Sequence, residues 1–540
     1  MRYYLWFLIF LSSALPGPPP ALLPAASPVA TVDRATILLR ERMAAAPPLR
    51  FELGGQILTG APELTCFYQR RGFAPAWSTE ERLLPVADQL LSALSTASND
   101  GLRPEDYRLA ALKGAADAVR RAPNAAARAE LDLLLSNAFF GYAADLSNGR
   151  ANPDRTRGKS AKVAECAPAP DAASAEAILE SALAEKRVRT ALTGFVPNER
   201  AYRVLREALL RYREISRRGE PALIAEGPKL QLGDRGERVV RLRERLRMAA
   251  EAAGAELPSA SAASDLFDEP LAQAVRQFQS RHGFAEDGVA GAATVAELNR
   301  SADDRIRQIE ANLERWRWLP SDLGERYVRV NIPAFRLDAM EEDRSVLTLR
   351  VVVGKPNTST PVLSSSMNAI QLNPSWYVPK TILDGEILPK AAKDPTFLDR
   401  LGYEVISETR LRQRPGPSNA LGKFKFVFPS PYGVYLHDTP SRSLFSRDLR
   451  ALSHGCVRVE NPFELAVWAL GNDPKWTPEE IRARLDSGKE KQVKLSEAVP
   501  VHIGYWTAWA GDDGVLRFGR DVYKQDAGLI RRLEGGKQKG

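Results

Sequence analysis

The pattern of hydrophobic and polar positions divides the chain into a helical N-terminal part and a C-terminal part rich in strands. In residues 31–220, apolar residues recur at helical spacing in a segment rich in Ala, Leu and Arg, which predicts a helical scaffold domain. The aromatic residues between Phe67 and Trp77 are expected to lie in its core. In residues 303–540 the pattern changes, from Tyr327 onward, to alternation with β-branched runs, which predicts a mainly β domain.

A small separate unit is predicted between these two parts, over residues 227–301. A turn rich in Gly and Asp leads into an amphipathic helix, a second helix follows, and a third begins at Thr294. His282 stands ahead of a glycine at the end of the second helix. A lone histidine in that position is more often a helix cap than a ligand, so we interpret it as a cap.

A helical pattern at residues 387–411 interrupts the predicted strands of the C-terminal domain. With its flanking loops, this insertion extends over residues 383–423. We expect it to act as a lid. The predicted fold class is therefore multidomain α+β, with a helical scaffold, a small three-helix module and a mainly β domain that carries a helical lid.

The first residues have the pattern of an export signal. Arg2 precedes an apolar run from Tyr3 to Leu11, and small residues and prolines follow as far as Ala30. The apolar run is shorter than the roughly 20 residues that a membrane-spanning helix needs. We therefore predict a signal peptide over residues 1–30 and an exported protein, with an uncleaved N-terminal membrane anchor as the alternative.

The composition limits the partners of the protein without naming one. A formal net charge of +8 in 540 residues suits anionic polymers or a membrane surface, but the basic residues are spread along amphipathic helices. Nucleic acid is therefore not an expected partner. The chain has three cysteines. Cys66 and Cys166 could pair in an oxidising compartment, which would leave Cys456 free, or all three could be thiols.

One short stretch contains the strongest candidate for catalysis. The sequence Ser-His-Gly-Cys-Val-Arg at residues 453–458 places Cys456 beside one of only four histidines, His454, and a second histidine, His437, lies upstream. A thiol becomes a good nucleophile when a base accepts its proton and a nearby cation stabilises the thiolate. Two imidazoles close to one cysteine meet that need. The motif predicts peptide-bond chemistry through a thioester on Cys456.

The same motif offers candidates for the other catalytic roles. His437 is one candidate for the base, and His454 is another, because residues two apart on an extended chain point to the same side. The backbone N–H groups of Gly455 and Cys456 could form an oxyanion hole, since glycine permits the unusual dihedral that such a turn requires. Spacing alone does not decide between the two histidines.

Residues around the motif are candidates for orienting the base and the substrate. A backbone carbonyl near Asp438 or Ser453 is expected to fix the tautomer of the base. Arg458 could orient a substrate carboxylate, with a structural ion pair to Glu460 as the alternative. The further candidates for substrate contact are Ser453, Tyr435, Trp376 and Asn419.

Together with its surroundings, the motif resembles the signature of the L,D-transpeptidase catalytic domain, also called the YkuD domain. Residues 316–320, 352–356, 373–376 and 436–440, and the order of scaffold, module and catalytic domain, are similar to the YcbB subgroup. The unit at residues 227–301 resembles the peptidoglycan-binding type 1 domain, which is found on many wall enzymes. A spacer that binds nothing is the alternative for this unit.

The resemblance implies a periplasmic enzyme of the cell wall in which His437 is the base and His454 shapes the pocket. The donor would be a peptidoglycan tetrapeptide stem cleaved before its terminal D-Ala. The acceptor would be the side-chain amine of the diamino acid in another stem, which gives a 3→3 crosslink. The resemblance implies no metal or organic cofactor. The expected partners are peptidoglycan stem peptides and glycan, with other wall-synthesis enzymes as further candidates.

Two other functions remain open from the sequence. A cysteine hydrolase of peptidoglycan, or of links between lipoprotein and peptidoglycan, would use the same Cys–His pair but admit water to the thioester. A non-catalytic wall-binding protein is the second alternative. It is less well supported, because Cys456 and His437 are both present.

Overall fold

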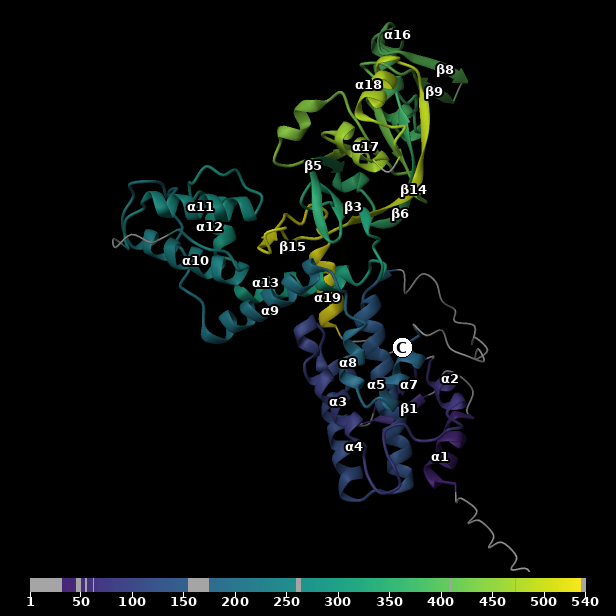
Figure 1. Cartoon of the computed structure of the whole chain (residues 1–540). Helices are drawn as coiled ribbons and strands as arrows, with labels where there is room; N and C mark the ends of the chain where they lie inside the picture. Colours follow the sequence, from purple (N-terminus) through teal and green to yellow (C-terminus); the bar gives the residue numbers. More distant parts are fainter. Residues whose placement is uncertain are drawn as a thin grey trace, which may run out of the picture.

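The computed structural model describes residues 32–44, 50–53, 56–61, 63–153, 174–258, 264–407, 409–471 and 473–535. The predicted signal peptide and Cys166 lie outside these residues. Figure 1 shows a helical body that contains the N-terminal residues, a small helical module, and a strand-rich body at the far end. The predicted multidomain α+β class is confirmed.

The helical body is arranged around the long helix α5 (Ala125–Asn148), which is buried along most of its length. The other helices of this body are α1 (Arg34–Met43), α2 (Glu63–Arg70), α3 (Pro85–Ser95), α4 (Leu109–Arg121), α7 (Ala175–Ala184), α8 (Val188–Thr193) and α9 (Arg200–Arg218). The shorter elements are a hairpin of β1 (Arg50–Leu53) and β2 (Gln56–Thr59) and the 3-10 turns η1 (Ala97–Asp100) and η2 (Pro104–Tyr107).

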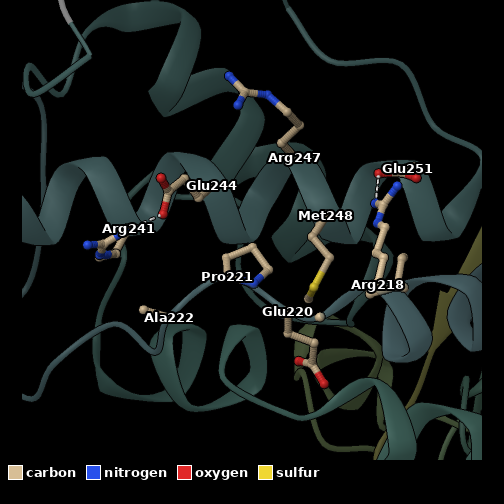
Figure 2. A pocket seen from close by; sticks show the side chains of 11 residues that line it. Arg218, Glu220, Pro221, Ala222, Arg241, Glu244, Arg247, Met248 and Glu251 are labelled. Atoms are coloured by element: carbon tan, nitrogen blue, oxygen red, sulfur yellow. Dashed lines mark hydrogen bonds and ion pairs between the residues drawn. The ribbon is translucent and has the colours of Figure 1, made fainter.

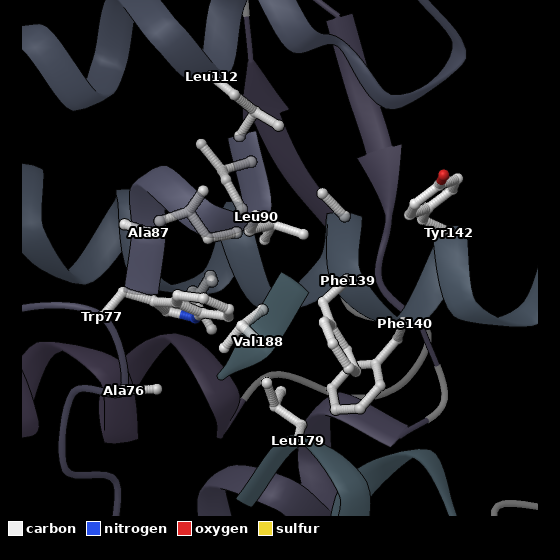
Figure 3. Close-up of a cluster of buried hydrophobic side chains, with 14 of the residues drawn as sticks. Ala76, Trp77, Ala87, Leu90, Leu112, Phe139, Phe140, Tyr142, Leu179 and Val188 are labelled. Carbon is white, nitrogen blue, oxygen red and sulfur yellow. The ribbon is translucent and has the colours of Figure 1, made fainter. Parts of the chain in front are cut away.

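The predicted aromatic core of this body is confirmed. Phe67 and Trp77 are buried, and Figure 3 shows Trp77 in one cluster with Phe139 and Phe140 of α5. Asp132 of α5 is buried beneath them and accepts hydrogen bonds from the backbone N–H of Trp77 (3.0 Å) and from a tyrosine hydroxyl (2.7 Å). These bonds partly offset the cost of burying the carboxylate, whose pKa is raised by burial to about 6.

The small module consists of α10 (Glu237–Ala253), α11 (Glu269–Arg281) and α12 (Ala292–Leu298). His282 is the C-cap of α11. Its Nδ1 lies 2.7 Å from the carbonyl of Phe278, on whose ring the imidazole stacks. Burial lowers the pKa of His282 to about 3, so the ring is neutral. The interpretation of His282 as a cap agrees with this geometry.

A shared core connects the helical body, the module and the strand-rich body. It is formed by α9, by α13 (Ala302–Trp316) and by the hairpin of β15 (Ala508–Ala510) and β16 (Leu516–Phe518). The last helix, α19 (Asp526–Glu534), packs on α13 (Figure 1). Arg317 is fully buried here and donates to the hydroxyl of Tyr202 at 2.8 Å. The three regions are therefore joined by side-chain packing as well as by the chain.

The strand-rich body contains a nine-stranded sheet in the order β12-β5-β13-β11-β10-β6-β14-β3-β4, and β4 also pairs with β5, so that the sheet closes on itself. Its apolar interior is backed by α17 (Pro462–Leu470) and α18 (Pro478–Asp486). The strands are β3 (Arg326–Asn331), β4 (Arg336–Glu341), β5 (Arg344–Gly354), β6 (Leu363–Leu372), β10 (Phe424–Val427), β11 (Leu436–His437), β12 (Ala451–Ser453), β13 (Val457–Val459) and β14 (Lys491–Gly504).

The predicted insertion is helical in its first half only. It forms α14 (Lys380–Ile382), the π-helical turn η4 (Leu383–Ile387), α15 (Leu388–Lys393) and α16 (Phe397–Arg400). The prediction of a helix as far as residue 411 is wrong beyond Gly402, which has φ of 72° and ends the helical part. The chain then forms β8 (Tyr403–Ser407) and β9 (Arg410–Gln413), which pair with each other, and β9 also pairs with β7 (Trp376–Tyr377). Strand pairing with β7 thus determines the structure of residues 403–413, although their local sequence pattern is helical.

We predict that Gly354→Ala destabilises the strand-rich body. A Cβ at Gly354, the last residue of β5, would lie 2.1 Å from the Thr358 carbonyl oxygen and 2.7 Å from the Thr360 nitrogen, so the following loop would have to move. The expected cost is about 2 kcal/mol, or a decrease of about 4–8 °C in Tm. Thermal unfolding followed by circular dichroism checks this. Gly114→Ala is the control, because a Cβ there meets no atom within 4 Å and alanine favours the helix. Equal Tm values for the two variants would contradict the prediction.

Candidate active site

Three neighbouring strands carry the candidate catalytic side chains on one face of the sheet. His437 of β11 is in register with Lys425 of antiparallel β10 on one side and with Arg458 of parallel β13 on the other. Residues in register point to the same face of a sheet. Their neighbours Leu436 and Val457 point to the opposite face and are fully buried in the core. The fold therefore places two cations and an imidazole together on the polar face.

Cys456 lies in the turn immediately before β13, and this turn is held from several sides. Gly455 has φ of 116°, a conformation that favours glycine. Its carbonyl accepts a hydrogen bond from the Thr360 hydroxyl (2.7 Å), and the Ser453 hydroxyl donates to the carbonyl of Cys456 (2.6 Å). These bonds connect the turn to β12 and to the loop after β5. These hydrogen bonds therefore fix the backbone position of Cys456.

The predicted oxyanion hole needs a correction. The N–H of Gly455 donates to the Ser453 hydroxyl at 3.1 Å, so it is already engaged within the turn. The N–H of Cys456 has no acceptor in the part of the chain that the structure describes. Only the second of the two predicted donors therefore remains available to a substrate. Ser453 shapes the turn through both of its hydrogen bonds and is buried, which argues against a direct contact with substrate.

Cys456 is a free thiol, whereas Cys66 is in a disulfide. Burial raises the pKa of the Cys456 thiol. Hydrogen bonds from the backbone and side chain of Tyr435 and the positive charges of Lys425 and Arg458 act in the opposite direction. The thiol is thus protonated at neutral pH in the free protein and needs a base to become a nucleophile.

His437 has the geometry of a neutral base. Its Nδ1 lies 2.5 Å from the carbonyl oxygen of Asp438, which agrees with the expected backbone carbonyl and leaves Nε2 as the acceptor nitrogen. Burial and the charge of Arg458 lower the pKa of His437 to about 3. The carboxylate of Asp438 is turned away, because it accepts from the backbone N–H groups of Lys423 and Thr439, each at 2.7 Å.

Tyr435 contacts both the imidazole of His437 and the thiol of Cys456. Its ring meets that of His437 edge to face, with 5.6 Å between centroids, and its hydroxyl is hydrogen-bonded to the sulfur of Cys456. The Trp376 side chain also forms a hydrogen bond to this hydroxyl. Burial raises the pKa of Tyr435, so the hydroxyl stays protonated. Both aromatic residues lie next to Cys456, where they can contact a substrate.

His454 faces the lid instead of the base position. Its Nε2 lies 2.7 Å from a carboxylate oxygen of Glu386 in η4, and the second carboxylate oxygen is 3.8 Å from Lys390. The lid core also packs on Tyr435. The inserted segment therefore lies against the turn that carries Cys456. The lid thus engages Nε2 of His454, whereas His437 is held through Nδ1 by a backbone carbonyl.

Arg458 and Asn419 differ in their capacity to contact a substrate. The Nε of Arg458 is buried without a hydrogen-bond partner in the described residues, and no ion pair to Glu460 is formed there. By contrast, the side-chain amide of Asn419 donates to the carbonyls of Pro374 (3.0 Å) and Arg414 (2.9 Å), and its oxygen accepts from a backbone N–H. Asn419 thus connects neighbouring loops by hydrogen bonds. Because its side-chain amide is already hydrogen-bonded within the protein, the predicted contact with substrate is not supported.

Two charged residues of the site were not among the sequence candidates. Lys425 lies between two buried phenylalanines of β10, and this alternation is the signal that could have placed it on the polar face. Glu386 is 68 residues from its partner His454, and no local pattern indicates such a contact.

A cavity of about 480 Å³ lies elsewhere, where α9 meets α10. Figure 2 shows Arg241 beside Glu244 at one end of the cavity, and Glu251 beside Arg218 at the other. Arg218 pairs with Glu251 at 2.5 Å and Arg241 with Glu244 at 2.9 Å. Because these charges are neutralised within the wall of the cavity, we assign it no ligand.

Family models identify three parts of the chain. Residues 325–493 match the model of the L,D-transpeptidase catalytic domain, YkuD. The chain contains a YkuD catalytic domain. Residues 62–209 match the Scaffold domain, and residues 235–298 match the "Putative peptidoglycan binding domain". Both predicted resemblances, to the YkuD domain and to the peptidoglycan-binding domain, are thereby confirmed.

One curated protein is similar to part of this chain. A "Putative L,D-transpeptidase" of Haemophilus influenzae is 32% identical over 247 residues, which are 42% of this chain and 50% of the relative. The chain thus spans about half the length of the curated relative that it matches.

Two solved structures are similar to this chain. The L,D-transpeptidase of Xylanimonas cellulosilytica has 18% identity over 52% of this chain and 98% of its own (TM-score 0.19). That of Stackebrandtia nassauensis has 13% identity over 53% and 97% (TM-score 0.22).

The YkuD and peptidoglycan-binding domains indicate a cell-wall enzyme family and an extracytoplasmic location. Within the described ranges, no helix has both the length and the hydropathy required to cross a bilayer.

The neutral state of His437 predicts the pH dependence of alkylation at Cys456. Because the pKa of His437 is lowered to about 3, the imidazole does not titrate near 6.5, the ordinary value for histidine. The alkylation rate with iodoacetamide should rise with pH as the thiol ionises, with no inflection near pH 6.5. Intact-mass kinetics across about pH 5–9 measure this. An inflection near pH 6.5 that disappears in His437→Asn would show that the imidazole titrates there after all.

Proposed function

We propose that this protein is a cysteine-dependent L,D-transpeptidase that crosslinks peptidoglycan stem peptides. The observation that carries the proposal is a free thiol, Cys456, in the turn before β13, which shares the neighbour Tyr435 with a neutral His437 whose Nε2 is the acceptor nitrogen, within a YkuD domain. A nucleophile, a base and a base-orienting carbonyl are the three parts of a covalent acyl-transfer site.

In the acylation step, Nε2 of His437 accepts the thiol proton while the sulfur attacks the carbonyl carbon that precedes the terminal D-Ala of a tetrapeptide stem. The C–N bond then breaks, and the amine of D-Ala leaves with the proton that His437 returns. The product is a thioester on Cys456. The N–H of Cys456 and the hydroxyl of Tyr435 are the donors that we assign to the developing oxyanion.

The site also offers a group for the charge of the donor peptide. The guanidinium of Arg458 is next to the thiol, and its Nε is buried without a protein partner in the described residues. A buried, unpaired polar atom costs stability, which a bound carboxylate would recover. We therefore assign Arg458 to a carboxylate of the donor stem.

In the second step, the side-chain amine of a diamino acid attacks the thioester carbon. His437 takes a proton from the amine, the C–S bond breaks, and the proton goes to the leaving thiolate, which gives a 3→3 crosslink and the free enzyme. Water at the same position would make the protein a hydrolase. The contact between Glu386 of the lid and His454 favours transfer, because a closed lid excludes water.

The other parts of the chain fit a wall enzyme in the periplasm. The module at residues 235–298 is assigned to peptidoglycan glycan or stem peptides, and the scaffold is a surface for other wall-synthesis enzymes. The predicted signal peptide would direct export. A protein that only binds the wall is disfavoured by the complete Cys–His pair.

The first test is intact-mass analysis of the mature protein with purified tetrapeptide stems. The wild type should gain the mass of the stem minus D-Ala and then release a crosslinked dimer, and Cys456→Ala should do neither. Disulfide-mapped, folded protein is used, so that a missing adduct cannot reflect misfolding. Shortened stem without dimer would identify a hydrolase. No adduct on the folded wild type would contradict Cys456 as the nucleophile for this substrate.

The lid contact gives a second prediction. Glu386→Ala should raise the ratio of hydrolysed stem to crosslinked dimer about two- to fivefold, because the half-exposed hydrogen bond with His454 contributes only about 0.5–1 kcal/mol to lid closure. Product ratios from liquid chromatography measure this change. Asp384→Ala is the matched control, since Asp384 lies in the same η4 turn but pairs only within the insertion, with Lys380. An unchanged ratio in Glu386→Ala would exclude this role for the contact.

A further inference from the structure

We propose that Lys425 is a positioning residue of this site, which holds Tyr435 against Cys456 and supplies the positive charge that favours the thiolate. The proposal rests on the assignment of Cys456 as the nucleophile. It adds a residue that belongs neither to the Ser-His-Gly-Cys-Val-Arg motif nor to the lid.

The position of Lys425 follows from strand register. Lys425 lies directly opposite His437 in the β10–β11 pair, so its side chain rises from the same face of the sheet as the imidazole. Its Nζ stands 4.4 Å from the centroid of the Tyr435 ring. A lysine ammonium at this distance above an aromatic face is attracted by the ring quadrupole, and more strongly where water is excluded. The tyrosine whose hydroxyl is hydrogen-bonded to the sulfur is therefore also held by a cation.

Lys425 is one of two cations that act on the thiol, the other being Arg458. His437 is neutral, and the carboxylate of Glu386 on the lid is engaged by His454. Glu490, which faces Lys425 from the start of β14, accepts a hydrogen bond from the Ser375 hydroxyl at 2.7 Å. In the described residues Lys425 forms no ion pair with any carboxylate. Its charge is thus available to the sulfur.

The two cations beside Cys456 differ in what they can do. Arg458 has a planar group with a buried, unpartnered Nε, which suits a bidentate substrate carboxylate. Lys425 is a compact point charge that already rests on Tyr435. Burial lowers the pKa of Lys425, and the proximity of the Cys456 thiolate opposes that shift. We assign substrate binding to Arg458 and thiolate support to Lys425.

The experiment compares Lys425→Met and Lys425→Arg with the wild type in two measurements. The first is the pH profile of iodoacetamide alkylation, with the adduct located at Cys456 by peptide mapping. The second is kcat and KM with a tetrapeptide stem. Lys423→Met is the matched control, because Lys423 lies two residues away, is exposed, and places its charge near Asp438, whereas Lys425 acts on the thiol.

Lys425→Met should raise the midpoint of the alkylation profile by about one pH unit and slow alkylation at neutral pH about tenfold. The kcat should fall by a similar factor with KM little changed, because the residue does not bind substrate. Lys425→Arg should restore most of both quantities, and Lys423→Met should match the wild type.

The proposal is overturned if Lys425→Met leaves the alkylation midpoint unchanged, or if Lys423→Met shifts it equally. An increase in KM at an unchanged midpoint would also overturn it, since Lys425 would then contact the substrate carboxylate. Alkylation needs no stem peptide. A shifted midpoint in a protein that never acylates would therefore leave this inference standing and refute the proposed function instead.

Discussion

The register of three short strands is the constraint on which the candidate site depends. β10, β11 and β13 bring Lys425, His437 and Arg458 side by side on one face, while Leu436 and Val457 point into the core of the sheet. A shift of one residue in any strand would exchange the polar and the apolar faces. The same apolar contacts that stabilise the sheet therefore also specify which side chains surround Cys456.

Burial then sets the chemistry of the site. It keeps the His437 imidazole neutral and the Cys456 thiol protonated, so that neither group is charged before substrate arrives. The carbonyl of Asp438 orients the imidazole. Tyr435 is held by contacts with the sulfur of Cys456, the indole of Trp376 and the ammonium of Lys425. A site prepared in this way needs little reorganisation when charge develops on the sulfur and on the substrate carbonyl.

The lid and the shared core act at a larger scale. The lid contacts the site through Glu386 and through apolar packing on Tyr435. A movement of the lid would therefore change the contacts of residues next to Cys456. At the opposite end of the strand-rich body, α13 and the hairpin of β15 and β16 pack with α9 and the small module. The catalytic body is thereby attached to the domain that matches a wall-binding family.

The sequence by itself determined the elements whose signals are local. Helical spacing indicated the scaffold, the glycine after His282 indicated a cap, and the rarity of Cys and His singled out Cys456 with two candidate bases, His437 and His454. Only the tertiary structure decided that His454 faces Glu386, that the N–H of Gly455 is occupied by Ser453, that Asn419 ties loops, and that residues 403–413 form strands. The physical reason is that hydrogen-bond partners and strand edges come from residues distant along the chain, and local periodicity carries no information about them.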